Sequence, residues 1–185
     1  MRAQPTTGTK RISGEDRRIV VIGNSGGGKS TLARRLGAAC GLPHTEIDAL
    51  LWEPGWSLTP AEVYAAEHAR LIAADKWIID GLGRRDSIPA RLSRASCIVL
   101  VDLPLWMHFW LAAERQLKWS RGAIENPPAG LAKMPPTEAI FRTIWEVDRE
   151  WMPEIRQLAT LEERQGKTVF RLTSIDDLDR FELSP

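Results

Sequence analysis

The residues best suited to chemistry lie together at positions 23–31, which spell Gly-Asn-Ser-Gly-Gly-Gly-Lys-Ser-Thr. The spacing is G-x-x-x-x-G-K-S, with an apolar run of strand length before it and an amphipathic helical pattern after it. A strand, glycine loop and helix in this order form a phosphate-binding P-loop, whose backbone N–H groups and helix N-terminus face phosphate oxygens. Lys29 is then placed to reach the β- and γ-phosphates of ATP, and the Ser30 hydroxyl to bind the Mg²⁺ that bridges them.

The whole loop and the first helical residue are predicted to bind the nucleotide. These residues are Gly23, Asn24, Ser25, Gly26, Gly27, Gly28, Lys29, Ser30 and Thr31. The rival dinucleotide fingerprint G-x-G-x-x-G fails, because Thr31 stands where it requires Gly or Ala. A nicotinamide-dependent enzyme is therefore disfavoured.

Length and composition predict one soluble domain. A chain of 185 residues is long enough to bury a sizeable core. Lys and Arg total 25 against 24 Asp and Glu, so bulk charge gives no reason to expect a nucleic-acid or membrane binder. No apolar run approaches the roughly 18 residues of a membrane span, and the N-terminus has no signal-peptide pattern, so we expect a cytoplasmic protein. Cys40 and Cys97 lack metal spacing and are expected to be buried apolar residues.

Short apolar runs separated by helical patterns predict an α/β fold. The expected strands are 18–23, 44–47, 77–81, 97–102 and 168–172. The expected helices are 31–40, 60–74, 104–120, 137–151, 153–165 and 175–183. Strands that are apolar throughout belong to a parallel sheet covered on both faces, so we predict a three-layer, doubly wound, five-stranded parallel sheet.

The order of segments predicts one domain with an insertion. Residues 1–17 are polar and are expected to form a disordered N-terminal tail, and residues 18–185 the domain. The stretch 121–136 is rich in Pro and Gly and is expected to be a lid-like insertion. A capping box at Thr59 with Pro60 at the first helical position is expected to open the helix 60–74.

Carboxylates follow the predicted strands. Asp48, Asp80 and Asp102 fall at strand ends, as Gly23 does. Ligands of doubly wound sheets bind outside the carboxyl ends of the strands, so these residues are expected to converge on one site.

Several of these segments together resemble a known family. They are Lys29-Ser30-Thr31, the Asp48 segment followed by Trp-Glu-Pro-Gly-Trp, Trp77-Ile78-Ile79-Asp80-Gly81, and Leu100-Val101-Asp102-Leu103-Pro104. Over residues 18–181 the chain resembles the adenylate-kinase-related P-loop proteins often labelled DNA topology modulation proteins. More broadly it is similar to the nucleoside monophosphate kinase and shikimate kinase group, which implies a P-loop nucleotide-kinase-like fold of the nucleoside triphosphate hydrolase class.

The resemblance implies roles for two residues and puts one acceptor in doubt. Asp80-Gly81-Leu82-Gly83-Arg84 is similar to the Asp-Gly-Phe-Pro-Arg segment of adenylate kinases, which makes Asp80 a partner of Mg²⁺ and Arg84 a phosphate clamp. The acceptor-helix motif Thr-Gly-Asp-x-x-Arg is replaced by Ser57-Leu58-Thr59-Pro60, and the lid lacks the usual Gly-Arg opening and Tyr-His ending. These departures argue against AMP as acceptor and leave ATP as donor unaffected.

The acceptor can be approached from charge. A hydroxyl acceptor benefits from a carboxylate that takes its proton, and Asp48 suits that role, with a loop cap as the alternative. An anionic acceptor needs cations to offset its charge. This role suits Arg84 and the arginines that follow it, Arg85, Arg91 and Arg94. Trp52 and Trp56 flank Pro54-Gly55 and are predicted to wall the substrate pocket.

Arginines near the predicted lid are candidates for stabilising charge in the transition state. Arg115, Lys118, Arg121 and Arg142 qualify, and a solvated helix face is the alternative for each. Arg115 and Arg121 are preferred because they precede the Pro/Gly-rich stretch. The remaining tryptophans, Trp106, Trp110, Trp119, Trp145 and Trp151, are expected to pack in the core or between helices. The three histidines, His44, His68 and His108, show no metal spacing and are given no role.

Two functions from different classes follow. The first is phosphoryl transfer from ATP, with Mg²⁺, to a small anionic or hydroxyl-bearing acceptor. The alternative, suggested by the family label, is a nucleotide-binding regulatory protein or NTPase associated with DNA topology. Salt-dependent DNA binding with and without ATP separates them, because a slope near zero removes the second.

Overall fold

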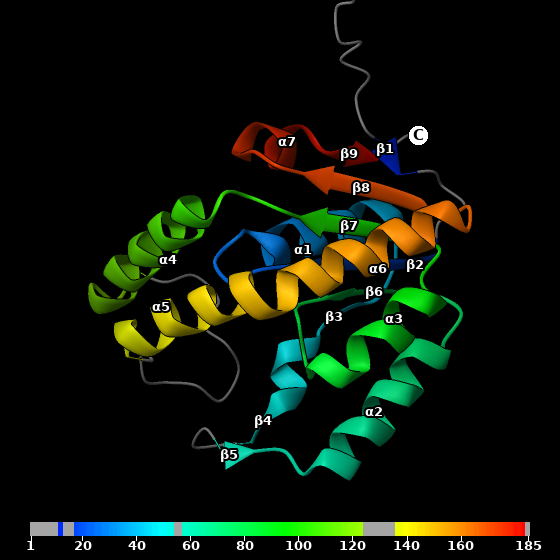
Figure 1. The fold of residues 1–185 in the computed structure, drawn as a ribbon, viewed down its shortest axis with the longest axis horizontal. Coiled ribbons are helices and arrows are strands. Elements are labelled where there is room, and N and C mark those ends of the chain that lie inside the picture. The colour runs from blue at the N-terminus through cyan, green and yellow to red at the C-terminus, as the bar shows by residue number, and fades with distance from the viewer. Residues whose placement is uncertain (1–10, 13–16, 54–56, 124–135, 184–185) are drawn as a thin grey trace, which may run out of the picture.

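The computed structural model of the protein describes residues 11–12, 17–53, 57–123 and 136–183 (Figure 1). Its centre is a five-stranded parallel sheet in the order β3-β6-β2-β7-β8. These strands are β2 (Arg18–Gly23), β3 (His44–Glu46), β6 (Trp77–Asp80), β7 (Cys97–Val101) and β8 (Thr168–Leu172). The P-loop strand β2 lies in the middle, which confirms the predicted doubly wound arrangement.

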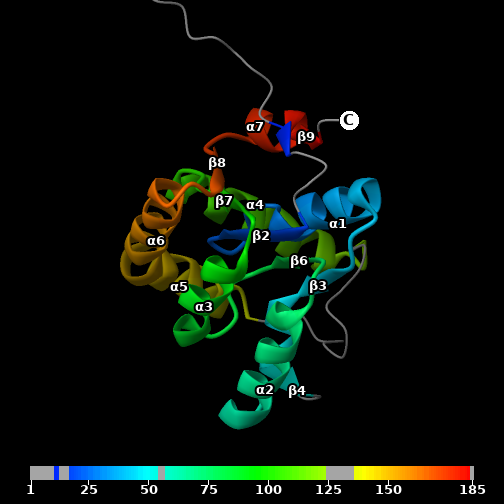
Figure 2. The ribbon, with the colours of Figure 1, turned by 90° about the vertical axis from the view of Figure 1, so that its right-hand side faces the viewer.

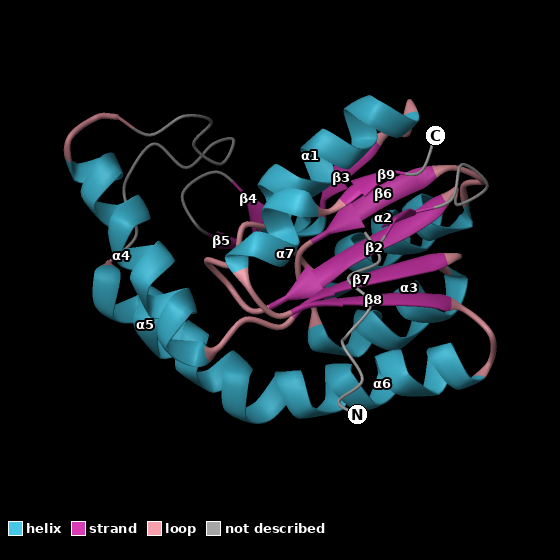
Figure 3. Cartoon of the chain, turned by 90° about the horizontal axis from the view of Figure 1, so that it is seen from above, coloured by secondary structure: helices cyan, strands magenta, loops and turns pink. Residues whose placement is uncertain are grey.

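Helices cover both faces of the sheet and give three layers (Figure 2). One face carries α1 (Lys29–Cys40) and α7 (Ile175–Arg180). The other carries α3 (Ile88–Arg94) and α6 (Met152–Arg164), with α2 (Ala61–Ala73) packed on α3. Beyond the carboxyl ends of the strands, α4 (Leu105–Ser120) and α5 (Thr137–Glu146) lie side by side (Figures 1 and 3).

The central strand explains why the sequence folds this way. Residues Ile19, Val20, Val21 and Ile22 of β2 are all fully buried. Val20 and Ile22 join the core under α3 and α6, whereas Ile19 and Val21 join the core under α1. Burying each such side chain contributes roughly 1.5–3 kcal/mol, so a strand without a polar face is stable only between two helical layers.

A proline widens the long helix that follows α5. The turn η3 (Val147–Trp151) is π-helical, and the N–H of Met152 donates to the carbonyl of Val147. Pro153 follows directly and has no N–H to donate, which removes one bond of an α-helical ladder. The sequence predicts that Pro153 kinks the helix or begins a new one; the structure has a local widening there, and α5, η3 and α6 follow one another without a gap.

Several short elements were not predicted. Trp52–Glu53 (β4) and Ser57–Leu58 (β5) form an antiparallel pair, and Arg11–Ile12 (β1) pairs in parallel with Glu182–Leu183 (β9). The 3-10 helices η1 (Ile47–Leu51) and η2 (Arg85–Ser87) precede β4 and α3. Most of the predicted tail, 1–10 and 13–16, and most of the predicted lid, 124–135, lie outside the described residues.

The predicted start of α7 is confirmed, and the predicted capping of α2 is wrong. Ser174 forms the expected cap of α7, as its side chain accepts from the N–H of Asp177 in a capping box. The capping box at Thr59 is wrong, because Pro60 has an extended backbone and is itself the N-cap of α2. The last helix also ends at Arg180 rather than near Leu183, since Glu182 and Leu183 join β1.

Two polar side chains, one on α2 and one on α3, are buried. Arg91 is fully buried, and His68 is 5% exposed. The rings of Tyr64 and His68 stack with their centres 5.9 Å apart. Burial, and secondarily the charge of Arg91, lower the pKa of His68 from 6.5 to about 4. His68 is therefore neutral in the folded protein at any pH well above 4.

Among the described residues, no helix has the length and apolar character needed to span a membrane.

The buried His68 makes folding stability depend on pH. Its pKa is lower folded than unfolded, so between about pH 6.5 and pH 4 the unfolded chain binds more protons and stability falls as pH falls. His68→Phe keeps a ring against Tyr64 and removes this titration. We expect the free energy of unfolding, measured by urea titration, to fall less from pH 7 to pH 5 in His68→Phe than in the unchanged protein. Equal losses in both proteins would contradict the assignment.

Candidate active site

The P-loop lies at the carboxyl end of β2 and leads directly into α1. Lys29 is the first residue of that helix and is 8% exposed. Its Nζ donates a hydrogen bond of 2.7 Å to the carbonyl of Asn24, so the lysine folds back across the loop. A buried ammonium held over a ring of backbone N–H groups is the arrangement expected of a phosphate site.

Side chains from other elements hold the loop in place. The Asn24 amide donates to the carbonyl of Ile144 in α5 at 2.8 Å. His108 of α4 is 1% exposed, and its Nδ1–H donates to the carbonyl of Ser25 at 2.8 Å. A Cβ at Gly27 would lie 2.9 Å from the His108 ring, so this glycine leaves room for the histidine. Burial lowers the pKa of His108, which favours the neutral form of the ring.

A buried carboxylate lies beside the loop. Asp80 ends β6, next to β2 in the sheet, and is 1% exposed. Ser30 Oγ donates to one of its oxygens at 2.6 Å, and His44 Nε2 lies 2.6 Å from the other. Both carboxylate oxygens thus have donors, which a buried carboxylate requires. The structure brings together Lys29, Ser30 and Asp80, as the sequence predicted.

Charge links the lysine to three other groups. Burial lowers the pKa of Lys29, the carboxylates of Asp48 and Asp80 raise it, and the charge of Arg115 lowers it. Arg115 extends from α4, and its guanidinium lies 5.7 Å from the centre of the Trp119 ring. Arg121 caps the end of α4 and is exposed, and residues 124–135 are outside the described part. Its predicted role stays a prediction.

Asp48 holds a loop rather than standing free. It belongs to η1, and its Oδ1 accepts from the N–H groups of Leu82 at 3.1 Å and Gly83 at 2.7 Å. Gly83 has φ +63°, and a Cβ there would lie 2.2 Å from the Tyr64 hydroxyl. Asp48 thus caps the loop through Oδ1, as the alternative role predicted for it, whereas no N–H of this loop donates to its Oδ2.

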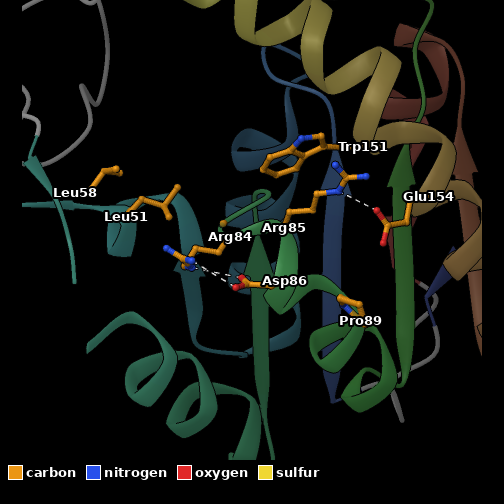
Figure 4. Close-up of a pocket in the computed structure, with 9 residues that line it drawn as sticks. Leu51, Leu58, Arg84, Arg85, Asp86, Pro89, Trp151 and Glu154 are labelled. Carbon is orange, nitrogen blue, oxygen red and sulfur yellow. Dashed lines mark hydrogen bonds and ion pairs between the residues drawn. The ribbon is translucent and has the colours of Figure 1, made fainter. Parts of the chain in front are cut away.

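A cavity of about 580 Å³ opens beside this loop (Figure 4). We call it the acceptor-side cavity, and its walls include Leu51, Leu58, Arg84, Arg85, Trp151 and Glu154. Arg85 is tied down, since it donates to Glu154 at 2.9 Å and to the Glu150 carbonyl at 3.0 Å. Within the described parts of the chain, the Arg84 side chain pairs only with the exposed Asp86, at 3.4 Å. Arg84 is thus the more available of the two cations.

A second cavity, of about 380 Å³, lies between α4 and α7 and is lined by Trp106, Met107, Trp110, Leu111 and Ile175. We call it the apolar cavity. Trp106 and Trp110 are 64% and 65% exposed, so the expectation that they pack in the interior is wrong. The face of α4 turned to the P-loop is instead occupied by His108 and Ala112.

Other predicted site residues lie elsewhere. The strand β7 ends at Val101, one residue before the predicted Asp102, and Asp102 pairs with Arg156 of α6 at 2.8 Å. Trp52 lies on β4 and does not line the acceptor-side cavity, and Trp56 is outside the described residues. Arg91 turns inward and is buried.

Sequence reasoning missed His44, His108, Tyr64 and Arg91. Each acts through a partner more than ten residues away or through backbone atoms, so spacing gave no signal for most of them.

Comparisons with known proteins give little beyond this geometry. No protein-family model and no curated protein matches the chain. Among solved structures, the chain is similar to one described as the crystal structure of a gluconokinase from Sinorhizobium meliloti 1021. The identity is 22%, the match covers 84% of this chain and 97% of that one, and the TM-score is 0.43.

The tight loop at Gly83 predicts a large cost for a small substitution. Gly83→Ala meets both an unfavourable φ and the Tyr64 hydroxyl, whereas Gly41→Ala has the same φ of +63° and open space. Denaturant unfolding should show a loss of about 1 kcal/mol for Gly41→Ala and at least about 2 kcal/mol for Gly83→Ala. Equal losses would mean that the loop at Gly83 yields without strain.

Proposed function

We propose that the protein transfers a phosphoryl group from ATP to a small acceptor that binds in the acceptor-side cavity. One observation carries the proposal: a buried carboxylate, Asp80, is bonded to Ser30 directly beside the buried Lys29. A P-loop lysine next to a hydroxyl and a carboxylate is the set of groups that Mg²⁺-dependent phosphoryl transfer uses.

The donor end would be built from contiguous residues. The triphosphate would lie over the loop N–H groups and the N-terminus of α1, with Lys29 on its β- and γ-oxygens. The apolar cavity lies between α4 and α7, and both helices touch the loop: Ala112 of α4 lies 3.5 Å from the position of a Cβ at Gly26, and Leu178 of α7 lies 3.8 Å from one at Gly28. Its exposed Trp106 and Trp110 offer ring faces to a nucleotide base.

The residues present fit Mg²⁺. Ser30 and Asp80 offer oxygen ligands, which Mg²⁺ prefers, and their oxygens are already within 2.6 Å of each other. In the described parts of the chain no group of three or more His, Cys, Asp or Glu side chains gathers around one point. This agrees with a cation held by one carboxylate, one hydroxyl and substrate phosphates. When bound, Mg²⁺ neutralises charge on the β- and γ-phosphates.

At the other end, an acceptor oxygen would attack the γ-phosphorus while the bond from that phosphorus to the β–γ bridging oxygen breaks, releasing ADP. The chain's part is to position the reactants and offset charge, with Lys29 and Arg115 near the transferred group and Arg84 on the acceptor. A hydroxyl acceptor must also lose its proton, and Asp48 Oδ2 is the base that we propose. An acceptor with an anionic group for Arg84 fits this cavity best.

The direct test is ATP consumption with a panel of acceptors. The panel contains nucleoside monophosphates, hydroxy acids of the shikimate type, and sugars with their acid forms. We expect at least one anionic member to raise ADP release well above the rate with ATP alone, and Lys29→Ala to lower it by about 10²-fold or more. A chain that binds Mg²⁺–ATP but phosphorylates no member would contradict the proposal.

Two neighbouring arginines give a matched comparison. Arg84→Gln removes the available cation of the cavity, and Arg85→Gln removes one already used by Glu154 and Glu150. With the best acceptor, we expect Arg84→Gln to lower kcat/KM by about 10²–10³-fold and Arg85→Gln by tenfold or less. The reverse order would remove Arg84 from the acceptor site.

A further inference from the structure

We propose that Arg91 is a positioning residue for the acceptor site: it clamps the loop Gly81-Leu82-Gly83-Arg84 from behind and so fixes where Arg84 meets the acceptor. The inference rests on the proposed function, because it takes the acceptor-side cavity as the place where the acceptor binds. Arg91 itself does not reach the acceptor, since it is fully buried.

The clamp is visible in the hydrogen bonds of this loop. Arg91 Nη2 donates to the carbonyls of Gly81 at 3.1 Å and Leu82 at 2.8 Å. On the opposite side, Asp48 accepts from the next two N–H groups, those of Leu82 and Gly83. The loop is thus held between a cation from α3 and a carboxylate from η1.

Tyr64 of α2 completes the clamp. Its hydroxyl accepts from the N–H of Arg84 at 3.1 Å and lies 3.1 Å from the hydroxyl of Ser87. Ser87 Oγ in turn donates to the carbonyl of Arg84 at 2.7 Å. Both backbone polar groups of Arg84 are therefore fixed, although its side chain lies in the acceptor-side cavity.

The loop needs these contacts because its two glycines do little to restrict the backbone. Gly81 and Gly83 have φ of +103° and +63°, and glycine has the largest conformational freedom of any residue. A Cβ at Gly83 would lie 2.2 Å from the Tyr64 hydroxyl and 3.3 Å from Arg91 Nη1, so the clamping groups lie directly against the backbone. Gly83 itself lines the cavity, so a shift of this backbone is a shift of the cavity wall.

The fold as a whole gains little from Arg91. It forms no ion pair with the described residues, and its Nε and Nη1 are buried without a hydrogen-bond partner. Burial accordingly lowers its pKa. A buried ionic group is often replaced by an apolar side chain of similar volume with no loss of stability. The benefit of the guanidinium is local, in the two carbonyls that it fixes.

The test compares Arg91→Met with a matched control, Arg35→Met. Arg35 also donates to backbone carbonyls, those of Leu178 at 2.6 Å and Phe181 at 3.0 Å, but between α1 and α7. In hydrogen–deuterium exchange, we expect Arg91→Met to speed exchange in the peptide containing residues 82–84 at least tenfold and to leave the P-loop peptide unchanged. Arg35→Met should not change the 82–84 peptide.

Kinetic measurements separate a positioning role at the acceptor site from a general loss of enzyme structure. With the best acceptor of the panel, Arg91→Met should raise the acceptor KM at least tenfold while the KM for ATP stays within twofold. Arg91→Lys, which keeps a cation for the carbonyls, should recover part of the loss. Should Arg91→Met fail to fold, Tyr64→Phe carries the same comparison, since it removes only the hydroxyl on Arg84.

Unchanged exchange at 82–84 overturns the clamp, and equal rises in both KM values overturn the positioning role. A panel in which no acceptor is phosphorylated defeats the proposed function instead, and the exchange measurement then still decides whether the clamp exists.

Discussion

The hydrogen bond between Ser30 and Asp80 is the contact on which the rest of the site depends. A carboxylate that is 1% exposed is stable only when both oxygens have donors. One donor comes from the first turn of α1 and the other, His44, from the start of β3. The ends of three elements must therefore meet, which agrees with the order β3-β6-β2 in the sheet. Lys29, one residue before Ser30, is brought to the same place.

The three central strands of the sheet, β6, β2 and β7, were predictable because they are buried on both faces. Such strands appear in the sequence as nearly unbroken apolar runs, and β6 and β7 ended within a residue of their predicted bounds. The pair β4–β5 is short and exposed and has no such pattern. The prediction for the tryptophans of α4 was wrong for another reason. Apolar residues surround much of that helix, so the sequence pattern does not show which face of the helix turns inward.

The candidate site also contains some residues that could be predicted from the sequence and others that could not. The P-loop and Asp80 were found because each is local, a loop with its helix and a carboxylate that ends a strand. His44 and Arg91 were missed because their roles are defined by partners in three dimensions. Arg91 was even taken as a cation for the acceptor, since its type suggests a ligand and only the fold shows that it turns into the core. Residue type indicates which chemistry is possible, and burial decides which of these possibilities the side chain can use.

The helical rod formed by α5, η3 and α6 connects the two halves of the site. At one end, the carbonyl of Ile144 accepts from Asn24 in the P-loop. Past the π-helical turn, Glu150 and Glu154 hold Arg85, on the wall of the acceptor-side cavity. One continuous element thus contacts both the P-loop and the wall of the acceptor-side cavity. The π-helical turn, which Pro153 directly follows, lies between Ile144 and Glu154, so the extra width of that turn changes the rotation between these two contacts about the helix axis.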